Sequence, residues 1–318
     1  MSVQSRTFVI DGGSLAGLEA RPDDGEVRGT VLALPGGGYR AGYWDSYGGD
    51  ADGSLLRLGA RLGRRVVAVD RPGYGDSMTP PRGRGAVAWQ AELLAGLVRE
   101  LGAEDGSVGV TLVGHSLGAI TALQIAADHP GLPLAGVSVS GLPVEYPEYM
   151  RVGMAAHPLD GAHLPAHPAE AVRMMFYGPD GSFDPEALER DLRNQAPVPV
   201  EEFVDARDYP TAFPSIAPRV RVPVQYVLAA HEASSCAGPE VLARAAASFA
   251  AAPWVEAFEQ AASGHDISLH RVARAYHLRV LAFDDECRVR CAATVHATGS
   301  TNGRTSPAAR ENVGSRYH

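Results

Sequence analysis

The segment 114–118, with the sequence GHSLG, has residue types and a spacing that suit nucleophilic catalysis. The apolar stretch 108–113 precedes it, and a stretch rich in Ala, Ile and Leu, 119–128, follows it. We predict that the chain turns sharply here from a strand into a helix. Such a turn holds the serine in a strained backbone conformation, and side chains at the two glycine positions would clash. The pattern therefore predicts that Ser116 is a nucleophile whose hydroxyl projects above the carboxyl end of a sheet.

A serine hydroxyl is a weak nucleophile and needs a neighbouring base. The chain has 11 histidines, and His265 has the most suitable position among them. It lies in the segment 262–266, ASGHD, after the last predicted strand and before the last predicted helix. This place in the order of strands and helices predicts that His265 is the base.

The base in turn needs a carboxylate that fixes its tautomer and stabilises the imidazolium. In the chain order serine, acid, histidine, this carboxylate should follow the strand predicted at 222–229. Glu232 lies just beyond that strand and is the predicted acid. Glu145, after the strand predicted at 134–140, is the alternative. We discount Asp266, because an immediate neighbour of the histidine would struggle to reach the imidazole from the correct side.

The oxyanion of a tetrahedral intermediate needs preorganised N–H donors. We predict that the backbone N–H of Leu117, the residue after the nucleophile, is one of them. The second donor is predicted in the turn after the buried strand 29–35, where a run of glycines permits close approach of the backbone. Gly37 is the first choice and Gly38 the second. The glycine run has neither the Lys-Ser/Thr pair nor the GxGxxG spacing of a phosphate-binding loop.

Residues that adjoin the nucleophile or the glycine turn are candidates for substrate contact. Gly38, Tyr39 and His115 are predicted to contact the substrate. Tyr39, like the nearby Tyr43, could equally serve packing alone.

Apolar strands alternate with helices over most of the chain. Strands are predicted at 7–11, 15–21, 29–35, 65–70, 108–113, 134–140, 222–229 and 254–260. Helices are predicted at 54–62, 86–102, 119–128, 238–251 and 268–283. Strands that alternate with helices of this length indicate repeated βαβ units. The predicted fold class is therefore α/β, with a mostly parallel sheet whose strands are buried on both faces.

This alternation breaks between residues 141 and 220. The stretch is rich in Pro and His and too long for a simple loop inside a compact domain. We predict a mostly helical cap insertion here, with helical patches near 169–176, 185–194 and 200–206. The predicted domains are an α/β core formed by 1–140 and 221–284, the cap insertion 141–220, and a disordered, Ser/Gly/Thr-rich tail, 285–318.

Two groups of residues could suggest a metal site. His157, His163 and His167 are separated by prolines, and their spacing fits a loop better than a ligand set. Cys287 and Cys291 could pair or bind a metal, but no His/Cys cluster surrounds them in the sequence. We therefore expect no metal.

Composition limits the classes of partner. The formal net charge of −9 argues against nucleic acid or an anionic membrane as the main partner. The start of the chain lacks a signal-peptide pattern, and no apolar stretch approaches the ~20 residues of a membrane-spanning helix. Three cysteines without a CxxC pair fit a reducing compartment. We expect a cytoplasmic protein that binds a small-molecule substrate, with no nucleic acid and no membrane; the sequence does not indicate the oligomeric state.

Four motifs together resemble the α/β-hydrolase superfamily: GHSLG at 114–118, LPGGG at 34–38, DRPGYGDS at 70–77 and SGHD at 263–266. The resemblance extends over about residues 7–283, with the cap loosely matched. It implies an eight-stranded, mostly parallel sheet with helices on both faces, a pocket between cap and sheet, and no cofactor. The serine argues against the epoxide hydrolases and haloalkane dehalogenases of the superfamily, which use Asp there.

Two positions depart from the pattern of the superfamily. Pro35 stands where many members have His, and Glu232 stands where Asp is usual. Neither departure removes a catalytic group.

These observations predict a serine hydrolase that cleaves an ester or thioester of a small to medium, largely apolar acid. Ser116, with His265 and Glu232, would form an acyl-enzyme. One alternative is a tailoring enzyme of natural product biosynthesis that uses the same residues for acyl transfer or for elimination, for example of acetate. The Ala-, Gly-, Arg- and Pro-rich composition, which resembles that of proteins from high-GC bacteria, suggests it. The other alternative is a non-catalytic ligand-binding relative.

Overall fold

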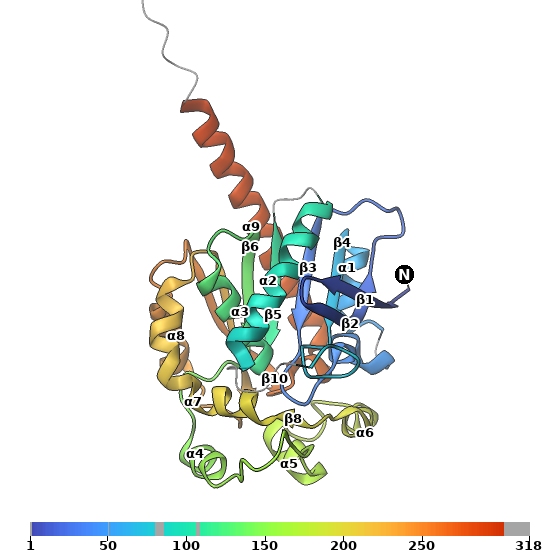
Figure 1. Ribbon diagram of the computed structural model, residues 1–318, viewed down its shortest axis with the longest axis vertical. Helices are drawn as coiled ribbons and strands as arrows, with labels where there is room; N and C mark the ends of the chain where they lie inside the picture. The colour runs from blue at the N-terminus through green and yellow to red at the C-terminus, as the bar shows by residue number, and fades with distance from the viewer. Residues whose placement is uncertain (1, 50, 80–85, 106–108, 302–318) are drawn as a thin grey trace, which may run out of the picture.

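The computed structural model describes residues 2–49, 51–79, 86–105 and 109–301, and these residues build one eight-stranded sheet (Figure 1). Its strand order is β1-β2-β4-β3-β5-β6-β9-β10. β2 is antiparallel to β1 and β4, and the remaining neighbours in this sheet are parallel. The strands are β1 (Gln4–Ile10), β2 (Gly13–Ala20), β3 (Gly29–Leu34), β4 (Arg64–Val69), β5 (Val110–His115), β6 (Leu134–Ser140), β9 (Val224–His231) and β10 (Val255–Gly264).

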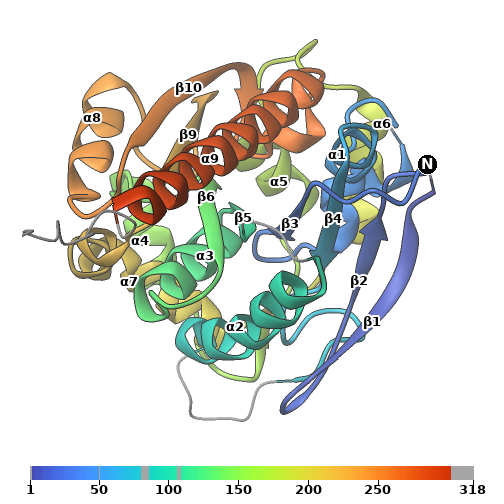
Figure 2. The ribbon, with the colours of Figure 1, turned by 90° about the horizontal axis from the view of Figure 1, so that it is seen from above.

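Helices cover both faces of the sheet because apolar side chains leave the central strands on both sides. In β4, Val67 and Val69 pack into the apolar cluster of α2, α3 and α8, whereas Val66 and Ala68 pack into that of α1 and α9, as the alternation of side chains along a strand requires. Figure 2 shows α1 and α9 on one side and α2 and α3 on the other. The predicted α/β class, with a mostly parallel eight-stranded sheet, is confirmed. The helices are α1 (Leu55–Arg61), α2 (Ala86–Asp105), α3 (Leu117–Asp128), α8 (Pro239–Ser248) and α9 (Ala273–Thr301).

Between β6 and β9 the chain leaves the sheet. We call residues 141–220 the inserted segment; its helices lie together beyond one end of the sheet (Figure 1). It contains α4 (Glu148–Ala155), β7 (His163–Leu164), α5 (Ala169–Phe176), α6 (Pro185–Asn194), β8 (Val198–Pro199), α7 (Val200–Ile216) and η2 (Ala217–Arg219). The bounds of α5 and α6 match the prediction, α7 runs ten residues beyond the predicted 206 to Ile216, and α4 was not predicted.

The last helix also extends farther than the sequence predicted. α9 continues through residue 285, where we predicted the tail to begin, to Thr301. Pairs spaced four residues apart, Asp284–Arg288 and Glu286–Arg290, support the helix there. The rest of the predicted tail, 302–318, lies outside the described residues.

Two 3₁₀ segments follow strands of the sheet: η1 (Ala41–Gly48), which is interrupted by non-helical residues, follows β3, and η3 (Ile267–Leu269) follows β10. Within the described part of the chain, no helix has both the length and the apolar character needed to cross a membrane.

Candidate active site

Ser116 lies at the junction of β5 and α3, in a strained backbone conformation. Its φ is 52° and its ψ is −119°, a combination that a non-glycine residue rarely adopts. A Cβ on Gly114 would lie 2.6 Å from the Cα of Ala119, and a Cβ on Gly118 would lie 2.2 Å from the carbonyl oxygen of Leu34. Both distances are far below van der Waals contact. The turn therefore requires glycine at both positions that the sequence singled out.

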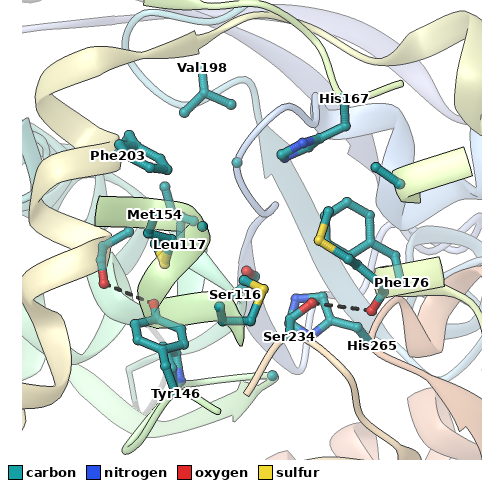
Figure 3. A pocket seen from close by; sticks show the side chains of 18 of the residues that line it. Ser116, Leu117, Tyr146, Met154, His167, Phe176, Val198, Phe203, Ser234 and His265 are labelled. Atoms are coloured by element: carbon teal, nitrogen blue, oxygen red, sulfur yellow. Dashed lines mark hydrogen bonds between the residues drawn. The ribbon is translucent and has the colours of Figure 1, made fainter. Parts of the chain in front are cut away.

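His265 and Glu232 meet at the same edge of the sheet. They follow β10 and β9, which are parallel neighbours. Nδ1 of His265 lies 2.9 Å from each carboxylate oxygen of Glu232, and both side chains are buried. The backbone N–H of Ser234 donates to Oε1 of Glu232 at 2.8 Å and so fixes the carboxylate from a second side. His265 lines the same cavity as Ser116 (Figure 3).

The protonation of His265 is governed by two opposing effects. Burial lowers the pKa of His265, whereas the charge of Glu232 and the hydrogen bond to it raise the pKa. Burial is the largest single effect, but the charge of Glu232, the hydrogen bond to it and the charge of Asp266 together exceed it, so the pKa of His265 lies above its usual value. The arrangement thus stabilises the imidazolium form of His265, which a base must adopt after it takes a proton.

Gly141 makes room for the imidazole, a role that the sequence analysis missed. It follows β6 directly, and its φ is 61°. A Cβ there would lie 2.6 Å from Cε1 of His265. Its position directly after a predicted strand, at the same sheet edge as the nucleophile, was the signal that could have identified it.

The two alternative acids have other partners. Glu145 is exposed and forms an ion pair with Arg244 at 2.5 Å. Asp266 accepts from the hydroxyl of Tyr39 at 2.6 Å and faces Nε2 of His115 at 2.9 Å. Neither carboxylate is hydrogen-bonded to His265 in the structure, so the geometry favours Glu232.

The glycine turn after β3 packs directly against the turn at Ser116. A Cβ on Gly37 would lie 3.1 Å from the side chain of Leu117, and a Cβ on Gly118 would lie 2.4 Å from the carbonyl oxygen of Pro35. Gly37, Leu117 and Ser116 all line the cavity. The N–H of Gly38 donates instead to the hydroxyl of Tyr74, at 3.4 Å. Of the two glycines proposed as oxyanion donors, the geometry therefore favours Gly37.

A cavity of about 430 Å³ opens above Ser116 and His265 (Figure 3). Most of its wall comes from the inserted segment, and no Lys, Arg, Asp or Glu occurs among the described residues that line it. Two histidines, His157 and His167, lie in this wall, and burial, followed by the charge of His157, lowers the pKa of His167. The apolar part of the wall includes Tyr146, Met150, Met154, Met174, Met175, Phe176 and Phe203.

The predicted substrate contacts divide between the cavity and the core. Tyr39 lines the cavity, whereas Gly38 and His115 do not occur among its described lining residues. The ring of His115 is fully buried, stacks on Tyr43 with centroids 5.0 Å apart, and faces Asp266. Its side chain points into the core because it is the last residue of β5, where alternate side chains leave opposite faces.

Tyr39 joins this core network to the inserted segment. Its hydroxyl contacts Asp266 at 2.6 Å and Asp191 of α6 at 3.4 Å, and Asp191 also accepts from Tyr177 at 2.9 Å. Burial, reinforced by the charge of Asp266, raises the pKa of Asp191 to about 8. The sequence analysis missed this network because its members are far apart along the chain.

One group of described side chains brings potential metal ligands together. Ligand atoms of His115, His265 and Asp266 lie within 4.8 Å of one another. Each residue is already hydrogen-bonded, His265 to Glu232 and His115 to Asp266. The group therefore belongs to the hydrogen-bonded site described above.

Comparison with known proteins assigns the chain to a family. Residues 31–284, more than half of the chain, match the Alpha/beta hydrolase family, and the protein belongs to it. The resemblance noted in the sequence is thereby confirmed.

Two curated relatives and two solved structures illustrate the similarity. An esterase of Mycobacterium tuberculosis is 38% identical over 104 residues, which cover 32% of this chain and 29% of that protein. The 2-hydroxy-6-oxo-6-phenylhexa-2,4-dienoate hydrolase of Comamonas testosteroni is 30% identical over 153 residues, 46% of this chain and 43% of that protein. The matches thus span less than half of these curated relatives.

The solved structures match over nearly the whole fold. The thermophilic esterase of Thermogutta terrifontis has a TM-score of 0.64 at 19% identity, and the match covers 88% of this chain and 99% of that one. The enol-lactonase of Burkholderia xenovorans has a TM-score of 0.62 at 18% identity, and the match covers 87% of this chain and 99% of that one. At these identities the likeness shows the shared fold.

Proposed function

We propose that the protein is a serine hydrolase that cleaves an ester or thioester of a small to medium, largely apolar acid through an acyl-enzyme. One observation carries the proposal: the buried hydrogen bond between His265 and Glu232, beside a serine on a strained turn between strand and helix. Membership of the Alpha/beta hydrolase family and a curated esterase among its relatives support it.

The first half-reaction forms the acyl-enzyme. Oγ of Ser116 attacks the carbonyl carbon while Nε2 of His265 takes the hydroxyl proton, and Glu232 stabilises the resulting imidazolium. The backbone N–H groups of Leu117 and Gly37 stabilise the oxyanion. When the intermediate collapses, His265 returns the proton to the leaving alcohol or thiol. Water then attacks the acyl-enzyme with the same base, and the acid is released.

The cavity wall supports an uncharged substrate. A carboxylate or ammonium group next to methionine and aromatic side chains would lose its hydration without gaining a partner. A cavity of about 430 Å³ falls within the range typical of small-molecule sites. In this proposal the inserted segment acts as a cap whose apolar wall selects the acyl group or the leaving group.

Covalent labelling with a fluorophosphonate tests the nucleophile. We expect labelling of the wild-type protein at Ser116, identified by mass spectrometry of the modified peptide. Labelling should be lost in Ser116→Ala and in His265→Ala, both checked for folding by circular dichroism. A folded wild-type protein that never labels would contradict the proposal.

A panel of acyl p-nitrophenyl esters tests the substrate class, and product analysis tests the reaction. Neutral acyl chains should exceed the matching ω-carboxylate chains in kcat/KM by at least about tenfold, because one buried, unpaired charge costs several kcal/mol. Hydrolysis yields the alcohol and the acid. An ester product in the presence of added alcohol would indicate acyl transfer, and an alkene from a suitable acetate would indicate elimination.

A further inference from the structure

Arg71, which the proposed mechanism does not use, lies against the back of the glycine turn. It comes two residues after the end of β4, in the motif DRPGYGDS, and is fully buried. Its Nε donates to the carbonyl oxygen of Pro35 at 2.7 Å, and its Nη2 donates to the carbonyl oxygen of Gly36 at 3.0 Å. One guanidinium thus holds two successive peptide units of the turn that carries Gly37.

The hydrogen bond to Gly36 sets the direction of the Gly37 N–H, together with the one that the same carbonyl accepts from the backbone N–H of Tyr39 at 3.3 Å. The carbonyl of Gly36 and the N–H of Gly37 belong to one peptide unit, and the described chain has no cis peptide bond. In a trans unit the C=O and the N–H point in opposite directions. Because Arg71 holds the carbonyl on the core side, the N–H of Gly37 is directed to the other side, toward the cavity that Gly37 lines. The positive charge of the Arg71 guanidinium, which lies against this carbonyl oxygen, also polarises the peptide unit and strengthens its N–H as a donor.

The inserted segment in turn holds Arg71. Glu202 of α7 is fully buried and forms an ion pair with Nη1 of Arg71, which also donates to Gln90 at 3.0 Å. Tyr74 donates to the second carboxylate oxygen of Glu202 and accepts the N–H of Gly38 at 3.4 Å. A buried guanidinium without its carboxylate would be costly, so Glu202 keeps Arg71 in place. The glycine turn is therefore connected to α7 through two paths.

We propose that Arg71 is a positioning residue for the oxyanion hole, and that Glu202 makes this position depend on the inserted segment. The inference rests on the proposed function, because it assigns Arg71 a role through the N–H of Gly37. Arg71 does not touch the substrate; it fixes the donor that does. Loss of Arg71 should then reduce the stabilisation of the transition state and leave binding of the substrate in the ground state nearly unchanged.

The test compares Arg71→Lys with a matched control, Arg65→Lys. Lysine keeps the charge but cannot hold two carbonyls in the fixed geometry of a guanidinium. Arg65 is also a buried arginine and belongs to β4, the strand that leads to Arg71. It is paired with Glu19 at 2.7 Å and lies beside Thr30, at the other end of β3 from the glycine turn. Measurements are kcat and KM for a p-nitrophenyl ester, the inhibition constant of an alkyl trifluoromethyl ketone, which forms a tetrahedral adduct with serine, and Tm.

In Arg71→Lys, kcat should fall about 10- to 100-fold, a part of what loss of one oxyanion donor costs. KM should stay nearly constant, and the trifluoromethyl ketone should bind more weakly by the same factor as kcat/KM falls. Arg65→Lys should leave kcat and ketone binding unchanged. A folded Arg71→Lys variant with wild-type kcat and ketone binding would overturn the inference, as would equal losses in the Arg65→Lys control.

Glu202→Gln keeps the volume of the side chain and provides the second test, which decides the matter if Arg71→Lys does not fold. It should lower kcat and ketone binding together, by about 3- to 30-fold, as partial misplacement of one donor would. Unchanged values in this variant would overturn the inference. A wild-type protein that neither labels with fluorophosphonate nor hydrolyses esters would overturn the proposed function and this inference together, which distinguishes the two failures.

Discussion

At the scale of single residues, Gly118 determines whether the turn at Ser116 can form. In Gly118→Ala the new methyl group would lie 2.2 Å from the carbonyl oxygen of Leu34 and 2.4 Å from that of Pro35. Backbone carbonyls cannot rotate away as a side-chain end can, so the turn itself must shift. We expect a loss of about 1–3 kcal/mol in the free energy of unfolding, as for other overpacked sites. We also expect kcat to fall at least about tenfold, because the nucleophile is displaced. Urea denaturation and ester hydrolysis measure the two effects.

The control for this substitution is Gly96→Ala in the middle of α2. A Cβ at Gly96 meets no atom within 4 Å. Alanine is the better helix former, so this change should raise the free energy of unfolding by about 0.5–1 kcal/mol and leave kcat unchanged. Wild-type stability and activity in Gly118→Ala would contradict the close packing described here.

Glu232 determines the pH at which His265 can act as a base. In the folded protein, burial lowers the pKa of His265, but the pKa is raised overall, and the charge of Glu232 is the largest of the effects that raise it. The base must be neutral, so kcat/KM should fall as the pH drops through a value above the ordinary 6.5 of histidine. In Glu232→Gln the charge is gone and burial dominates. The acidic limb of the profile should then move to lower pH, and kcat should fall about 10³- to 10⁴-fold, because the tautomer is no longer fixed.

Glu145→Gln is the matched control for the acid. The Glu145 side chain is exposed and paired with Arg244, a kind of ion pair that contributes about 0–1 kcal/mol to stability. Its loss should leave both the pH profile and kcat unchanged. If Glu145→Gln lost activity while Glu232→Gln kept it, Glu145 would be the acid.

At the scale of elements, α4 shapes the cavity although none of its residues is buried in the core. Met154 lines the cavity, and Val152, two positions earlier, is 61% exposed and does not line its described part. Met154→Trp would fill part of the space above Ser116. We expect kcat/KM for long acyl esters to fall about tenfold relative to short ones, the usual scale for pocket-size discrimination. A chain-length series of p-nitrophenyl esters measures the ratio.

Val152→Trp adds the same side chain to the same helix and should leave the chain-length preference unchanged. An equal shift in both variants would indicate that a disturbance of α4, rather than occupied volume, alters the preference. No shift in Met154→Trp would contradict the assignment of this wall to the substrate.

The elements that the sequence predicted well are those with a strong local pattern. The central strands are continuous apolar runs, and α5 and α6 have clear helical spacing. The observed bounds of these elements therefore lie close to the predicted ones. α7 continues past the prediction through Pro210 and Pro214, two residues that normally end a helix, because Tyr209, Phe213 and Ile216 bury its apolar side against α3. Packing of this kind is not visible in local sequence.

At the scale of the whole molecule, topology explains why the proposed site residues could be named from the sequence. Parallel strands end at one edge of the sheet, so Ser116, Glu232 and His265, each just past a strand end, had to lie near one another. The cavity wall and the Arg71–Glu202 pair could not be predicted in this way. They depend on how the inserted segment packs on the core, and no periodicity or strand order encodes that packing.

The opposite edge of the sheet holds the charges that fix α9. Asp284 accepts from Arg64 at 2.5 Å, from Thr111 at 2.5 Å and from Arg288 at 2.8 Å, and Arg288 also binds the carbonyl oxygen of Gly109. Arg64 and Thr111 lie at the amino-terminal ends of β4 and β5, and Gly109 directly precedes β5, whereas Ser116 follows the carboxyl end of β5. The molecule therefore separates a stabilising charge cluster from the proposed chemistry.

Asp284→Asn tests this separation. It removes the carboxylate that two buried arginines share, which should lower the free energy of unfolding by about 3 kcal/mol or more. Because the sites are distant, kcat per folded molecule should stay within about twofold of wild type. Urea denaturation and active-site titration with a fluorophosphonate separate the two quantities. The control Glu286→Gln breaks only an exposed pair on the same helix and should change stability by about 0–1 kcal/mol. If the activity of Asp284→Asn fell by more than the number of active sites that fluorophosphonate labels, the separation would be contradicted. Such a result would mean that α9 transmits the change across the sheet to Ser116.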